Sequence, residues 1–369
     1  MIFIKEHILA TQHLHDHIVL HLSPFPATSK LPIQIKRTDE DGIDTVRVYL
    51  RTSSNHFFNR VLVYGSLLLA LLQILVGGFY PDIVHLHIFA EVRFMLFIAR
   101  LFQIPTVITE HWSALSRPTA LSPHRLAKAK TIYETCNIVL PVSDYLRECI
   151  ERNTGASFTY RVIFNAVNEQ VFYFEGSTNV SGNTKRQTKR LLTIARTEEP
   201  KDFPTLFKAV RQLVDAGYDI TLDIVGDGNK RADFEQLAQA ILIGHVVTFH
   251  GSQPKDIVAS MMRKSDLFVL SSKWENSPCV IGEALCCGLP VVASAVGGIP
   301  ELLQPGDGLT VPAEDPTSLA QAIQEVLARD NSIDGASISE RAHSRFGYQS
   351  IGRQLDQVYR DVHLNGLKR

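Results

Sequence analysis

Two carboxylates, Glu275 and Glu283, lie eight positions apart in the segment ENSPCVIGE. Pro278 between them suits the first turn of a helix, where its missing N–H costs nothing. The free N–H groups of that turn, at Cys279 and Val280, could bind a phosphate or sugar oxygen. Glu283 could then accept hydrogen bonds from ribose hydroxyls, and Glu275, in the preceding loop, from sugar hydroxyls. An ordinary acidic helix start would show the same pattern, so both interpretations stay open here.

Two cations follow an apolar run at Leu191–Ala195 and could bind the phosphates of such a ligand. Arg196 offers a planar fork of donors and Lys201 a compact ammonium, and phosphate oxygens accept from both. The pair predicts a diphosphate clamp, although two surface cations beside a loop would give the same sequence.

Glycines follow the next apolar runs. Gly226 and Gly228 permit a sharp turn at a strand end. Their string VGDGNKR is not the dinucleotide fingerprint G-x-G-x-x-G, because Arg231 stands where the motif has its last Gly. Gly297-Gly298 precedes a short predicted helix, Ile299–Leu303, and either brings backbone N–H groups near an anion or makes a turn.

Histidines in the first half of the chain give weaker signals. His87 ends one predicted strand, and Glu110 and His111 follow another, so these side chains could point into the same crevice as the segment above. His85 lies on the same strand face as His87, where it could equally be a hydrogen-bonded core residue.

Two other clusters contain residue types that bind metal ions, but their spacing or position does not fit a metal site. His13, His15 and His17 span a helix end and a strand start, and residues two apart do not share a helix face. The run Asp39-Glu40-Asp41 resembles a D-x-D motif but falls in a polar loop between strands. We therefore predict no metal site and interpret the acidic run as solvated surface.

Two series of apolar strands alternating with helices must position these residues. Such runs imply parallel sheets covered on both faces, whose ligands bind beyond the carboxyl ends of the strands. The first series is expected at His17–Leu22, Thr45–Leu50, Asp82–His87, Thr106–Thr109, Asn137–Pro141 and Val162–Phe164. The second is expected at Leu191–Ala195, Ile220–Val225, Val246–His250, Leu267–Leu270, Val291–Ala293 and Leu309–Val311. Helices are expected at Val92–Phe102, Asp144–Arg152, Phe203–Val214 and Pro316–Ala328.

The run FEGSTNVSGNTKRQTKR between the two series has the composition of a linker. We therefore predict an α/β fold of two facing Rossmann-like domains with helix-covered parallel sheets. Residues 1–174 would form the first domain, 175–189 the linker and 190–347 the second domain. Residues 348–369 would form an amphipathic helix that packs back on the first domain.

Composition excludes several classes of protein. The net charge of −1 gives no support for nucleic-acid binding. Five cysteines, without a C-x-x-C motif, favour a reducing cytoplasmic setting. The start MIFIKEHILATQ has early charges and no small-residue cleavage site, which is not typical of a signal peptide.

One apolar segment raises the question of a membrane. Val61–Phe79 contains nineteen residues without a charge, close to the length that spans a bilayer. It also contains Tyr, Ser, Gln and three glycines, and a buried-type strand follows it. A buried helix is therefore expected, with a membrane-facing helix or a true span as alternatives.

Taken together, these residues resemble the family 4 glycosyltransferases, which have the GT-B fold. The resemblance covers nearly the whole chain in order, and its most specific part is the E-x7-E segment followed by GLPVVAS. The strings that carry it are PDIVHLH, ITEHWS, NIVLPVSDYLRECI, VIFNAVNEQVF, IARTEEPKDFPTLFKAV, IVGDGNKR, ENSPCVIGEALCCGLPVVASAVGGIPEL and GDGLTVPAEDP.

The resemblance implies a retaining glycosyltransferase whose co-substrate is a nucleotide-diphosphate sugar, with no metal or other cofactor. Glu275 and His111 would be catalytic, the first holding the transferred sugar and the second contacting it from the first domain. The leaving phosphate would itself take the proton of the acceptor. The implied donor-binding residues are Arg196 and Lys201 at the diphosphate, Gly226, Gln253 in the loop beside the base, Cys279, Val280, and Glu283 at the ribose.

The acceptor is expected to be a glycan or a lipid-linked molecule, in envelope or exported polysaccharide synthesis. That role would place the enzyme in the cytoplasm, with peripheral contact to the inner face of the cytoplasmic membrane. A nucleotide-sugar epimerase and a catalytically impaired donor-binding protein are the alternatives.

Three features depart from the family pattern. The usual P-N-G/V-V-D is FNAVN here, and Pro278 stands where a small residue is usual. The first strand and the glycine-rich loop before the first helix are absent. That strand would lie between those at His17–Leu22 and Asp82–His87, so we expect an apolar slot there. We also expect that Met1 is not the native start, or that an N-terminal coding segment was lost.

Overall fold

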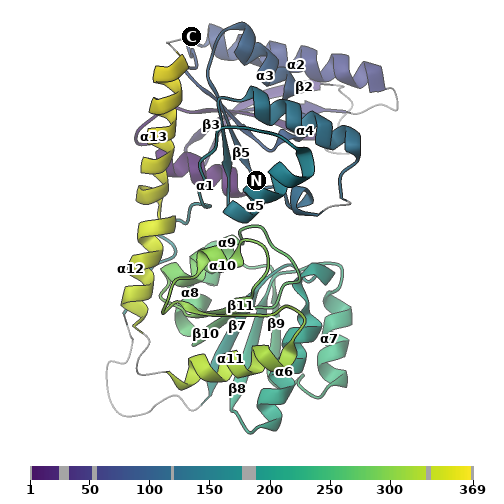
Figure 1. The fold of residues 1–369 in the computed structure, drawn as a ribbon, viewed down its shortest axis with the longest axis vertical. Coiled ribbons are helices and arrows are strands. Elements are labelled where there is room, and N and C mark those ends of the chain that lie inside the picture. The colour runs from purple at the N-terminus through teal and green to yellow at the C-terminus, as the bar shows by residue number, and fades with distance from the viewer. Residues whose placement is uncertain are drawn as a thin grey trace.

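The structure is a computed structural model that describes residues 2–24, 33–51, 56–117, 120–176, 188–329 and 334–366. Two α/β domains lie one above the other along the long axis and face each other (Figure 1). This is the predicted arrangement of two Rossmann-like domains. Most of the predicted linker, residues 177–187, falls outside the described residues.

The second domain is built on a six-stranded parallel sheet in the order β12-β11-β10-β7-β8-β9. Its strands are apolar on both faces because helices cover both, and each face has its own buried cluster. Every strand predicted for this domain is present, with ends shifted by at most two residues. The strands are β7 (Lys189–Ile194), β8 (Ile220–Val225), β9 (Val247–Gly251), β10 (Leu267–Leu270), β11 (Val291–Ser294) and β12 (Gly308–Val311).

Short loops join these strands to the helices that cover them. Proline stands in the first turn of α6, α10 and α11, where its fixed φ favours the helix start. The helices are α6 (Phe203–Asp215), α7 (Arg231–Ala240), α8 (Lys255–Lys264), α9 (Cys279–Cys286), α10 (Ile299–Leu302), α11 (Pro316–Ala328) and α12 (Gly335–Phe346).

The strands of the first domain form two separate three-stranded sheets. One has the order β1-β3-β2 and the other, fully parallel, has the order β4-β5-β6. Their strands are β1 (Ile18–Pro24), β2 (Ile33–Glu40), β3 (Ile43–Leu50), β4 (Val84–His87), β5 (Thr106–Glu110) and β6 (Ile138–Pro141).

The strands of this domain differ from the prediction in two places. β2 was not predicted: it pairs antiparallel with β3, so Asp39 and Glu40 lie on a strand and Asp41 in the hairpin turn. The segment Val162–Phe164 is not a strand, although the amide of Ile163 donates to Pro141 O at 3.1 Å.

A cavity of about 820 Å³ lies between β1 and β4. It is lined by Ile18, Leu20 and Leu22 from one strand and by Val84 and Leu86 from the other. Among the described residues, β1 and β4 each pair with a neighbour on one side only. The cavity therefore lies where the sequence predicts an apolar slot, and within the described part of the chain no strand pairs with the edges of β1 and β4 that border it.

Helices α1 (Ile2–Thr11), α2 (His56–Val76), α3 (Arg93–Leu101), α4 (Pro123–Thr135) and α5 (Asp144–Thr154) complete the first domain. The expectation that Val61–Phe79 is a buried helix was wrong for one face of α2. Ala70 and Ile74 are buried against β3 and Leu67 is also buried, but the opposite face of the helix is exposed.

The last helix, α13 (Tyr348–Gly366), continues upward from α12 and returns the chain to the first domain (Figure 1). Ile351, Leu355 and Val358 are fully buried there and join a cluster with Ala10 of α1 and Leu140 of β6. The C-terminal segment therefore holds α1 in place.

At Gly352 the backbones of α1 and α13 pack closely, because a Cβ on this residue would lie 2.2 Å from the carbonyl oxygen of Ala10. We expect Gly352→Ala to lower the free energy of unfolding by about 1–3 kcal/mol, despite the better helix propensity of alanine. Urea denaturation measures the change, with Arg353→Ala on the exposed side of the same helix as control. Stabilisation by Gly352→Ala would contradict the close contact.

Candidate active site

An ion pair between Lys201 and Glu275 lies at the carboxyl edge of the second sheet. The ammonium of Lys201 donates to Oε1 of Glu275, and Ser272 Oγ donates to the same oxygen at 2.8 Å. Only 20% and 12% of the two side chains are exposed. The carboxylate is therefore held in one position by two donors, as a group that must orient a ligand requires.

The loops that carry this pair are fastened to each other. Ser271 Oγ lies 3.1 Å from both Lys201 O and Asp202 O, and the amide of Lys273 donates to Pro200 O at 2.9 Å. The loop after β10 thus fixes the short 3-10 helix Glu199–Lys201 that follows β7.

Arg196 does not join Lys201 in the structure. Its side chain is 73% exposed and donates from Nη1 to Glu198 Oε1 at 3.1 Å. The predicted clamp is therefore not assembled, and the guanidinium would have to turn toward a bound phosphate.

Glycines bring the loop after β8 against the loop after β7. A Cβ on Gly226, where φ is 129°, would lie 2.0 Å from Ala195 O, and one on Gly228 would lie 2.7 Å from Thr197 O. No side chain fits at either contact, so the two loops form a continuous surface next to Arg196. The neighbouring Gln253 is half-buried, and its amide donates to His250 O at 2.7 Å.

Helix α9 begins just beyond Pro278, as predicted, and no side chain caps its first turn. Cys279 and Val280 occupy that turn, and Glu283 follows one turn later. Burial raises the pKa of Glu283 to about 7, an effect that Lys255 opposes and Glu6 reinforces. Burial also raises the pKa of the Cys279 thiol, with a further contribution from Glu283.

Sequence reasoning missed Glu6, which α1 brings from the first domain to this region. Its Oε1 accepts from Lys255 Nζ of the second domain at 2.5 Å, and its Oε2 accepts from the hydroxyl of Tyr348. Glu6 is only 6% exposed. The only sequence signal was the charged pair Lys5-Glu6 on a largely apolar helix.

His111 faces the second domain from the end of β5. Its carbonyl oxygen accepts from Asn276 Nδ2 at 3.2 Å, one residue beyond Glu275. Burial lowers the pKa of His111 to about 3, and nearby His7 contributes, so the imidazole is neutral. The ring of His111 lies 5.8 Å from that of His7 and 5.7 Å from that of His87.

Glu110 does not point into the crevice, contrary to the prediction. Its buried carboxylate accepts from the amides of Phe89, His111 and Trp112 at 2.9–3.1 Å and from the hydroxyl of Tyr133 at 2.7 Å. Burial raises its pKa despite these donors. Glu110 therefore fixes the loop that presents His111.

His85 is a structural residue. Its Nδ1 lies 2.7 Å from Tyr359 Oη and its Nε2 lies 2.7 Å from Thr109 Oγ1. Burial lowers the pKa of both His85 and His87, whose rings stack with centroids 4.5 Å apart. Among the described residues, no three His, Cys, Asp or Glu side chains are grouped so that they could hold a metal ion.

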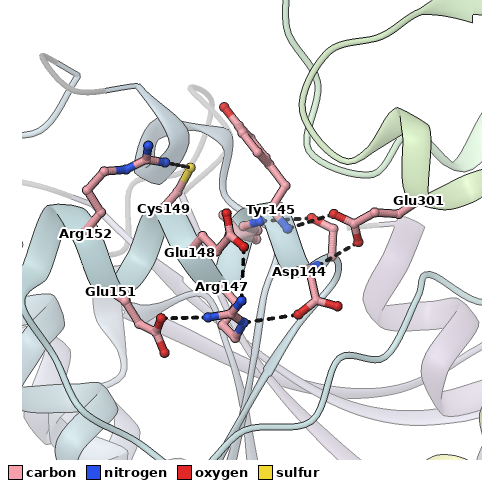
Figure 2. Close-up of polar contacts among 10 residues, drawn as sticks. Asp144, Tyr145, Arg147, Glu148, Cys149, Glu151, Arg152 and Glu301 are labelled. Carbon is pink, nitrogen blue, oxygen red and sulfur yellow. Dashed lines mark hydrogen bonds and ion pairs between the residues drawn. The ribbon is translucent and has the colours of Figure 1, made fainter. Parts of the chain in front are cut away.

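The two domains also meet through Glu301 of α10. Its carboxylate accepts from the amides of Asp144 and Tyr145, both at 2.8 Å, at the start of α5 (Figure 2). A Cβ on Gly298 would lie 2.0 Å from Asn276 O and 2.8 Å from Ser143 Cβ, and one on Gly297 would lie 1.7 Å from Glu275 O. The two glycines thus permit close backbone packing beside Glu275.

Glu301→Ala is expected to loosen this contact, because α5 loses two charge-assisted hydrogen bonds at its positive end. The free energy of unfolding should fall by about 1 kcal/mol, since the contact is partly exposed. Glu301→Gln keeps one acceptor oxygen, so its free energy of unfolding should lie between those of the wild-type protein and Glu301→Ala. Equal stability of all three proteins in urea denaturation would show that the contact contributes nothing.

Known proteins match both halves of the chain. Residues 12–171 match the model described as Glycosyltransferase Family 4, and residues 178–345 match Glycosyl transferases group 1. N-acetyl-alpha-D-glucosaminyl L-malate synthase of Bacillus anthracis is 30% identical over 62% of this chain, and the match spans only 61% of that protein.

Two solved structures show the same fold. Sucrose-phosphate synthase from Thermosynechococcus elongatus has a TM-score of 0.79 at 22% identity, with 99% of this chain and 93% of that chain covered. Anabaena HepE in complex with UDP-glucose has a TM-score of 0.64 at 19% identity, with 76% and 79% covered.

Proposed function

This chain belongs to the family 4 glycosyltransferases and has the GT-B fold, and on that premise we propose that it transfers a sugar from a nucleotide-diphosphate sugar with retention of configuration. The observation that carries the proposal is the partly buried Lys201–Glu275 ion pair, which lies next to Asn276, whose side chain contacts the backbone of His111 in the other domain. It combines a cation for a leaving diphosphate with a fixed carboxylate for the sugar.

The donor would lie along the carboxyl edge of the second sheet. Lys201, joined by Arg196 once its side chain turns inward, would neutralise the diphosphate. The uncapped first turn of α9 would add the N–H groups of Cys279 and Val280. Glu283 would accept from the ribose hydroxyls, and Gln253 would lie beside the base. These contacts would stabilise the departing charge without a metal.

Retention would follow if the acceptor attacks the face of the sugar from which the diphosphate leaves. The leaving phosphate would take the acceptor's proton, so no protein base is required at that step. His111 would contact the sugar as a neutral imidazole, because burial keeps it deprotonated at neutral pH. Glu275 would orient the sugar and stabilise positive charge on it.

The acceptor would be a glycan or a lipid-linked molecule bound by the first domain, in envelope or exported polysaccharide synthesis. All five cysteines are free thiols, which supports a cytoplasmic location. The exposed apolar side of α2 supports an acceptor held at a membrane.

A thermal-shift screen of nucleotide-diphosphate sugars tests the donor, because a ligand that binds only the folded chain raises its melting temperature. The best binder is then incubated with candidate acceptors, and the anomeric configuration of the product is read by NMR. Retained transfer is the expected result. An epimerised donor without acceptor would make the protein an epimerase, and binding without turnover would make it a donor-binding protein; either result contradicts the proposal.

A further inference from the structure

Helix α2 exposes a continuous apolar stripe. Val61, Tyr64, Leu68, Leu72 and Val76 recur every three or four residues, the spacing of one helix face. Their exposed fractions run from 43% to 88%, and Phe58 and Leu69 are exposed beside them. Scattered exposed apolar side chains are common, but a stripe along about four helical turns marks a surface that a membrane or another molecule covers.

The opposite face of α2 is packed inside the first domain. Ala70 is fully buried and Ile74 nearly so, in a cluster with Val46 and Val48 of β3, and Leu67 on the same face is also buried. The segment Phe58–Val76 is long and apolar enough to cross a membrane. A helix that is packed on its own domain through its second half, from Ser66 to Ile74, would instead lie parallel to a membrane surface.

Helix α3 extends the apolar surface. Phe97, Leu101 and Phe102 are 62–66% exposed, and the rings of Phe94 and Tyr64 stack across the two helices with centroids 5.0 Å apart. We call the exposed apolar residues of α2 and α3, with Phe102, the apolar face. Both helices lie on the far side of the first domain from the second domain (Figure 1).

Basic side chains border the apolar face. A cavity of about 940 Å³ beside α2 and α3 is lined by Arg60, Arg93, His124 and Lys128, together with aromatic rings. Arg100 at the end of α3 is also exposed. Neither α2 nor α3 contains an acidic residue, so Arg60, Arg93 and Arg100 give these two helices net positive charge.

We propose that the apolar face and its basic border dock the protein on the surface of a bilayer that contains anionic phospholipids. The apolar side chains would enter the interface between headgroups and acyl chains, and the arginines would lie near lipid phosphates. Net positive charge favours anionic lipid over a second copy of the chain, whose identical border would repel. The inference deepens the proposed function by bringing the acceptor domain to the membrane, but docking itself requires no sugar transfer.

Vesicle flotation of the full chain tests the proposal with phosphatidylcholine alone and with added phosphatidylglycerol. Wild-type protein should bind the anionic vesicles at least about tenfold more tightly than the neutral ones, and high salt should weaken that binding. Leu68→Glu/Leu72→Glu should abolish flotation, and Arg60→Gln/Arg93→Gln should remove only the preference for anionic lipid.

The matched control is Leu242→Glu, which changes an even more exposed leucine on the second domain and should float like wild type. Unchanged melting temperatures would show that the variants remain folded. The proposal is overturned if wild-type protein does not float, if Leu242→Glu behaves like the α2 variant, or if concentrated protein self-associates through Leu68 and Leu72 without binding lipid. Docking without transfer would contradict only the proposed function.

Discussion

Lys201→Ala is expected to lower kcat/KM for sugar transfer by about 10²–10³-fold, the effect of removing one donor to the leaving charge. The loss should appear mainly in kcat, because charge on the diphosphate grows as the bond to the sugar breaks. Initial rates with the donor found by thermal shift measure both constants. Lys208→Ala, an exposed lysine on α6, is the matched control.

The same substitution should also destabilise the protein, because Glu275 is left buried without its cation. Breaking such a pair costs about 3 kcal/mol, whereas removing both charges costs less. Lys201→Ala/Glu275→Gln should therefore recover stability without recovering activity. If activity returned together with stability, Lys201 would act only by holding the fold.

Glu283→Gln is expected to weaken donor binding by about 10–100-fold at pH 8, where the carboxylate of the free protein is ionised. Because its pKa is about 7, protonation below that pH should weaken wild-type binding by up to about tenfold per unit. Titration calorimetry from pH 5.5 to 8.5 should show this pH dependence of donor affinity in the wild-type protein and not in Glu283→Gln.

Donor binding should strengthen as pH rises, whereas the contribution of Glu283 to the free energy of unfolding should fall. The pKa of Glu283 rises from 4.5 to about 7 on folding, so the folded chain holds more protons than the unfolded chain between those values. Stability from this group is therefore present at low pH and is lost as pH rises through 7. Glu283→Gln should melt higher than wild type at pH 8, whereas Glu340→Gln, on an exposed site, should not.

Replacing Arg196, Lys201 and Glu283 together should abolish transfer. Persistent turnover by that variant would place the donor elsewhere. Arg196→Ala alone separates the two cations: because the guanidinium points to solvent in the structure, its loss should raise KM for the donor more than it lowers kcat.

Several features of the site were readable from local sequence. The helix start at Pro278, the glycines after β8 and the strands of the second domain all depend on nearest neighbours along the chain. The direction in which a polar side chain points at a strand end does not depend on those neighbours alone. Arg196 was predicted beside Lys201 but pairs with Glu198, and Glu110 was predicted in the crevice but binds three amides of its own domain.

Residues that act across domains were the least predictable. Glu6, Tyr348 and Lys255 meet from three segments far apart in the chain, and Glu301 binds the start of α5 more than 150 positions away. No periodicity connects such positions, because their distance is set by how helices pack rather than by how they form.

By itself the sequence determined two series of apolar strands, the helix start that carries the second carboxylate and the family, since apolarity, proline and glycine act on the backbone around them. Only the tertiary structure decided that Lys201 holds Glu275, that α2 keeps one apolar face exposed, and that β1 and β4 border a cavity. Burial and charge pairing depend on which surfaces meet, and that is settled only when the whole chain has packed.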